Sequence, residues 1–256
     1  MHFLFYVFCY KILVGVFMQR LLIKNKKSIY LFAFLSIEFA LWICVLVLSG
    51  AWVRFLSYAT VAIAFLFTLL FMEKRVDTLL AIGGLFCTCV ADIFLVILQK
   101  EGDTLAMCVF LCAQACYAGR TYLLAKSRKE GLVQVLVRVG LSVLIGLATV
   151  LVLRAKTKAV FVISTVYYVN LLCSIVFSFW HWKGSARAKL MAVGFLSFAL
   201  CDVSIGLDFL IDIFALGEGS ALYAFLHGGV SFVDVFYPPS QAILGASVYP
   251  ALKGQK

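Results

Sequence analysis

The chain is a series of apolar runs, each long enough to cross a membrane, separated by short charged turns. A helix needs about 20 mostly apolar residues to cross the hydrocarbon core of a bilayer. We therefore expect an all-α polytopic membrane protein with about eight transmembrane helices. Pro238 and Pro239 in the last run predict either a broken helix or a short surface helix before it. The expected spans are residues 30–48, 54–72, 78–98, 105–125, 132–153, 158–180, 188–212 and 222–250.

Composition excludes a soluble domain. Of the 256 residues, 64% are hydrophobic and 13% are charged, with a mean hydropathy of +1.08, which lies outside the range of soluble globular proteins. The net charge of +10 resides in the turns and not on an amphipathic face with interleaved aromatic residues, so we expect no nucleic-acid partner. Membrane lipids are the expected surroundings, in the cell membrane of a bacterium or the endoplasmic reticulum membrane of a eukaryote.

The chain divides into one membrane domain and two short flanks. Residues 30–250 contain no hydrophilic stretch long enough for a soluble domain, residues 1–29 are an apolar extension with a basic flank, and residues 251–256 are a short basic tail. Residues 1–17 lack the basic start and small-residue cleavage site of a signal peptide. An extension and a ninth span remain the two interpretations of that segment.

Basic residues are distributed unevenly between alternate turns. If the residues before Tyr30 face the cytoplasm, 14 lysines and arginines lie on the cytoplasmic side and five on the other. The positive-inside rule then predicts that both termini are cytoplasmic.

One motif occurs twice, 110 residues apart, and places an aspartate deep in an apolar run each time. Gly84 precedes Asp92 by eight residues, Gly194 precedes Asp202 by eight residues, and a small residue stands just before each aspartate. A carboxylate in hydrocarbon costs several kcal/mol, so such a residue is a functional-site candidate. Two neighbouring carboxyls can also serve as an acid and a base.

The offset of four spans between the two motifs has two interpretations. Either the chain consists of two four-helix halves in parallel orientation, as in many membrane proteins, or small residues coincide by chance. With eight spans, both aspartates lie at the same depth.

Further polar side chains are expected near this depth. Their two interpretations are a polar pocket around the aspartates and hydrogen bonds between packed helices. Arg120, close to the cytoplasmic end of its span, either snorkels to the interface or pairs with a phosphate or an aspartate. The expected pocket residues are Gln114, Tyr117, Tyr167, Tyr168, Asn170, Tyr237 and Gln241.

We expect neither a metal nor a cofactor. Cys108, Cys112 and Cys116 share a helix face, but no histidine lies in a span beside them, and zinc sites usually combine such ligands. The cysteines are interpreted as small packing residues.

The order and span placement of these polar residues resemble the YhhN family of lysoplasmalogenase-like membrane proteins. The resemblance extends from about Tyr30 to Val248. It implies eight spans and hydrolysis of the vinyl ether of a lysoplasmalogen to a fatty aldehyde and a glycerophospho-alcohol. It also implies that Asp92 and Asp202 are the catalytic pair, with substrate-binding residues at Gln114, Tyr117, Tyr167, Asn170, Tyr237 and Gln241.

Two other function classes also use aspartates within membrane spans. Intramembrane aspartyl proteases have two, but Val90-Ala91-Asp92 and Leu200-Cys201-Asp202 match neither of their motifs. A non-enzymatic carrier or lipid-binding protein could use the same pair for proton or cation coupling. Aldehyde release from lysoplasmalogen, measured beside proton-linked uptake, distinguishes an enzyme from a carrier.

Overall fold

The computed structural model describes residues 26–48, 50–70, 75–98, 104–154, 158–214, 220, 223, 226 and 231–249. Within these residues the chain is helical and contains no strand, which confirms the predicted fold class. The elements are α2 (Lys26–Val47), α3 (Ala51–Leu70), α4 (Val76–Asp92), the π-helical turn η1 (Ile93–Ile97), α5 (Thr104–Tyr122), α6 (Arg128–Leu153), α7 (Ala159–Trp180), the 3-10 turn η3 (Trp182–Gly184), α8 (Ala186–Phe214) and α10 (Phe232–Ala246).

Six described helices are long and apolar enough to cross a membrane, so the chain has the character of a multi-pass membrane protein. Helix α10 is shorter than a span, with 15 residues, and most of residues 222–230 lie outside the described part. The count of eight spans therefore stays a prediction. The six candidate spans are Ile29–Val47, Trp52–Leu70, Val76–Ile97, Arg128–Leu153, Ala159–Trp180 and Ala186–Asp208.

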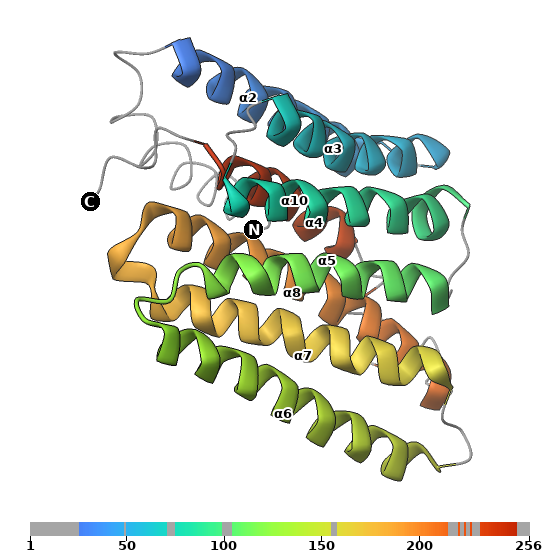
Figure 1. Ribbon diagram of the computed structural model, residues 1–256. Coiled ribbons are helices and arrows are strands. Elements are labelled where there is room, and N and C mark those ends of the chain that lie inside the picture. Colours follow the sequence, from blue (N-terminus) through green and yellow to red (C-terminus); the bar gives the residue numbers. More distant parts are fainter. Residues whose placement is uncertain are drawn as a thin grey trace.

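The helices lie alongside one another in one bundle (Figure 1). Helix α6 forms one edge and α2 and α3 form the opposite edge, with α4, α5, α8 and α10 between them. Helix α4 packs on α5 and α8 on α10, while α5 also contacts α7 and α10 contacts α3. The outer surface is apolar: Leu136, Leu144 and Val152 of α6 are exposed, as expected for side chains that face lipid.

Two glycines of the repeated motif allow close helix approach. A Cβ atom at Gly84 would lie 2.6 Å from Cε1 of Tyr117 on α5, and one at Gly194 would lie 2.9 Å from Cδ2 of Leu244 on α10. Both distances are shorter than packed carbon atoms tolerate. Each motif glycine thus lets its helix pack against the helix that follows it.

Helix α10 continues through Pro238 and Pro239, so the predicted break at this pair is wrong. Pro238 has no N–H and cannot bond the carbonyl of Asp234, four residues earlier. The indole Nε1 of Trp42 on α2 donates to that carbonyl at 3.1 Å. A neighbouring helix therefore satisfies the backbone group that the proline leaves free, which is how membrane helices tolerate proline.

Candidate functional site

The two motif aspartates occupy matching places in their helices. Asp92 lies 16 residues after the start of α4 and Asp202 lies 16 residues after the start of α8. Asp92 is buried and Asp202 is half-buried, while Ala91 and Cys201 before them are buried in the aromatic core. The π-helical turn η1 begins directly after Asp92, and such turns are frequent at functional sites.

Each aspartate accepts a short hydrogen bond from a tyrosine on another helix. The Tyr237 hydroxyl of α10 donates to Oδ2 of Asp92 at 2.5 Å, and the Tyr167 hydroxyl of α7 donates to Oδ2 of Asp202 at 2.5 Å. Both tyrosines are buried. A phenol that donates at this distance holds its carboxyl in one orientation.

One aromatic cluster joins the two tyrosine–aspartate pairs. The Phe198 ring lies between the tyrosines, with its centroid 6.5 Å from that of Tyr167 and 5.7 Å from that of Tyr237. The Phe110 ring covers Tyr167 at 5.9 Å. Asp92 and Asp202 are close enough to interact electrostatically. The structure therefore brings both carboxyls to one apolar region inside the bundle.

The two glutamines and Tyr117 are completely buried. Both amide atoms of Gln114 and Oε1 of Gln241 have no hydrogen-bond partner among the described residues, while Nε2 of Gln241 donates to Ser240 Oγ at 3.1 Å. The Tyr117 ring packs edge-on against Phe195, with centroids 5.3 Å apart. Buried amides without partners are costly and suggest a missing ligand or water. Their assignment to substrate binding stays a prediction.

Asn170 lies apart from the two carboxyls. Its Nδ2 donates to Ser142 Oγ of α6 at 3.3 Å and to the Val166 carbonyl at 2.9 Å. Its own carbonyl accepts a hydrogen bond of 2.8 Å from Arg138 of α6. In this structure Asn170 joins α6 to α7, and its expected contact with substrate stays a prediction.

Asp77 and Arg187, which were not predicted from the sequence, form a second buried polar cluster with Arg120. Asp77 precedes Asp92 by 15 residues and Arg187 precedes Asp202 by 15 residues. The 110-residue offset of the motif, extended toward the helix starts, would have identified the pair.

The arrangement suits proton transfer. One carboxyl can donate a proton and the other can accept one, since both are held by phenols in an apolar enclosure. Among the described residues, no three histidine, cysteine, aspartate or glutamate side chains lie together as metal ligands would.

Comparison with known proteins places the chain at the level of a family. No curated protein and no solved structure matches it. The matching family model covers residues 52–232, which include both aspartates and Tyr167 and end where α10 begins. The chain therefore belongs to the YhhN family.

Proposed function

We propose that this protein is a membrane-embedded hydrolase that cleaves the vinyl ether bond of lysoplasmalogen-type lipids. The products are a fatty aldehyde and a glycerophospho-alcohol. Membership of the YhhN family is consistent with this activity. The observation that carries the proposal is the pair of carboxyls, each held by a tyrosine, in one apolar region.

Vinyl ether hydrolysis needs an acid and then a base. One aspartic acid donates its proton to the vinyl carbon distant from the ether oxygen, which leaves an oxocarbenium ion. The partner carboxylate stabilises this cation and takes a proton from the water that adds to it. The resulting hemiacetal collapses to aldehyde and alcohol. The sum is one water consumed per ether cleaved, and a proton passes from the base back to the acid.

A parallel repeat would place both carboxyls at one depth. We propose eight spans in two four-helix halves, in which α4 corresponds to α8 and α5 to α10. Two observations support this: burial is the same at equivalent positions, and the contact of α5 with α7 is mirrored by that of α10 with α3. The equivalent buried residues are Gly84, Leu85, Thr88, Cys89 and Ala91, and Gly194, Phe195, Phe198, Ala199 and Cys201.

Depth also orients the lipid. Asp92 lies five residues before the end of η1 at Ile97, or roughly 8 Å at about 1.5 Å per residue. The other end of α4 is about three times as far away. A lysolipid would therefore keep its head group at the Ile97 end of the bundle and extend its chain toward Val76.

The test measures aldehyde release by the purified full-length protein. A lysoplasmalogen is the substrate, and the matched saturated alkyl-ether lysolipid is the control, because it has no double bond to protonate. We expect turnover of the vinyl ether alone. Asp92→Asn and Asp202→Asn should each lower kcat by about 10²–10⁴-fold, since asparagine keeps the size but transfers no proton.

Asp208→Asn is the matched control variant, because it makes the same substitution in α8 at an exposed position. It should leave turnover unchanged. Near-normal turnover in both motif variants would contradict the carboxylate mechanism. If the wild-type protein released no aldehyde but catalysed proton-linked uptake into vesicles, a carrier that uses the same aspartates would replace the hydrolase.

A further inference from the structure

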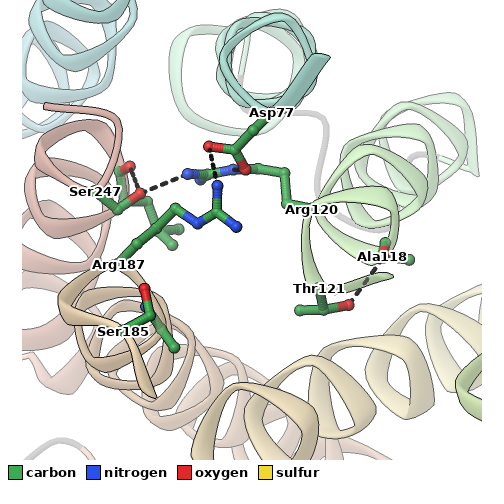
Figure 2. Close-up of polar contacts among 9 residues, drawn as sticks. Asp77, Ala118, Arg120, Thr121, Ser185, Arg187 and Ser247 are labelled. Carbon is green, nitrogen blue, oxygen red and sulfur yellow. Dashed lines mark hydrogen bonds and ion pairs between the residues drawn. The ribbon is translucent and has the colours of Figure 1, made fainter. Parts of the chain in front are cut away.

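A second polar cluster lies at the other end of the bundle, where four helices meet (Figure 2). Asp77 begins α4, Arg120 ends α5, Arg187 begins α8 and Ser247 follows α10. Arg120 Nε donates to Asp77 Oδ1 at 3.2 Å and Arg120 Nη2 donates to Ser247 Oγ at 2.8 Å. Arg187 Nη1 lies 3.1 Å from Asp77 Oδ2. One carboxylate is thus shared by two guanidinium groups.

The cluster carries more positive charge than its described residues neutralise. Two arginines face one aspartate, and Arg75 also interacts electrostatically with Arg187. A buried charge without a partner is strongly unfavourable. The described part of the cluster is therefore incomplete by one negative charge or more.

Two buried donors have no acceptor among the described residues. Arg120 is completely buried, and its Nη1 makes no hydrogen bond. The Nε of Arg187 is also buried and unpaired. The side chain of Arg187 is 29% exposed, so the cluster is open to its surroundings on that side. The unused donors of two arginine forks match the oxygen atoms of a phosphate group.

This cluster is separate from the aspartate pair. Asp77 and Asp92 are 15 residues apart near opposite ends of α4, which gives a separation of roughly 22 Å at about 1.5 Å per residue. The few bonds between a head-group phosphorus and a vinyl ether cannot span that distance. A phosphate bound at the arginines is therefore not the head group of a lipid reacting at the aspartates.

We propose that Arg120 and Arg187 form a second site, which binds a phosphate group at the end of the bundle opposite to the aspartate pair. The phosphate comes either from a membrane phospholipid or from a soluble anion on the side that the basic turns assign to the cytoplasm. Asp77 holds both guanidinium groups in place and Ser247 orients that of Arg120. This site goes beyond the proposed hydrolysis and does not depend on it.

The test uses thermal unfolding of the full-length protein. In detergent, inorganic phosphate should raise Tm above the value in sodium chloride of equal ionic strength, because a ligand that binds the folded state stabilises it. In lipid nanodiscs, phosphatidylglycerol should raise Tm relative to phosphatidylcholine alone. An effect of inorganic phosphate identifies a soluble anion, and an effect of phosphatidylglycerol alone identifies a head group; either supports the site.

Two substitutions break the same Asp77–Arg187 ion pair and change the charge in opposite directions. Arg187→Gln should weaken the apparent phosphate affinity at least roughly tenfold, the scale of one charge-assisted hydrogen bond. Asp77→Asn should strengthen it, since it removes the competing carboxylate. Arg187→Lys keeps the charge without the fork and should give an intermediate affinity.

A purely structural role for the ion pair predicts a different pattern. Both variants would then lower Tm and leave the phosphate-dependent shift alike. That result, or a wild-type protein stabilised by neither phosphate nor phosphatidylglycerol, would overturn the proposal.

Discussion

At the scale of single residues, a tyrosine hydroxyl fixes the orientation of each aspartate. Tyr237→Phe removes the donor to Asp92 and Tyr167→Phe removes the donor to Asp202. We expect each variant to lower aldehyde release by roughly ten- to a hundredfold, the scale of a hydrogen bond to a charged group, and by less than Asp92→Asn. Initial rates at saturating lysoplasmalogen give the comparison.

The neighbouring hydroxyl of Tyr168 provides the control. It lies on the same helix, and the described structure gives it no hydrogen bond to either carboxyl. Tyr168→Phe should therefore keep its activity. Equal losses in the Tyr167 and Tyr168 variants would mean that the phenols act through general packing of α7.

Sequence alone identified both aspartates and both tyrosines as candidates, but not their pairing. Tyr167 and Asp202 are 35 residues apart and Tyr237 and Asp92 are 145 apart. Helix periodicity reports which residues share a face of one helix. It does not report which helices become neighbours, and the pairing depends on that.

At the scale of helices, the motif glycines set how closely neighbours pack. Gly194→Ala should lower Tm, because its Cβ would meet Leu244 at 2.9 Å; overpacking of this kind costs about 1–3 kcal/mol. Gly206 lies on the same helix, and a Cβ atom there would meet nothing within 4 Å among the described residues. Gly206→Ala should therefore be neutral or slightly stabilising.

A second substitution tests whether the contact itself is responsible. In the double variant Gly194→Ala with Leu244→Ala, the added methyl occupies space that the leucine vacates. The two changes should then destabilise the protein by less than the sum of their separate effects. Additive losses would show that Gly194 acts through some other contact.

Helix positions were predictable where charged turns separate the apolar runs. The run predicted at residues 132–153 is α6 (Arg128–Leu153), and that at 188–212 is α8 (Ala186–Phe214). The course of α10 through Pro238 was not, because the Trp42 indole that compensates for the proline lies 192 residues from its acceptor. The π-helical turn after Asp92 likewise has no signal in the pattern of apolar residues.

At the scale of the whole molecule, the basic turns predict how the bundle is oriented. Ser220 follows α8, on the side opposite to the cytoplasm in this orientation. In a background without the native cysteines, Ser220→Cys should react with a membrane-impermeant maleimide added outside the cell. Labelling that requires a broken membrane would reverse the orientation, and with it the cytoplasmic location of the arginine cluster.

The hydrogen bond between Trp42 and Asp234 joins the first described helix to the last one. During synthesis, α2 enters the membrane long before α10 has been translated. The bundle therefore closes only when the end of the chain arrives, and until then α2 lacks the neighbour that its indole bonds. A chain that stops short of α10 would leave this seam open and lose the hydroxyl that holds Asp92, so assembly and the candidate site would be completed by the same late step.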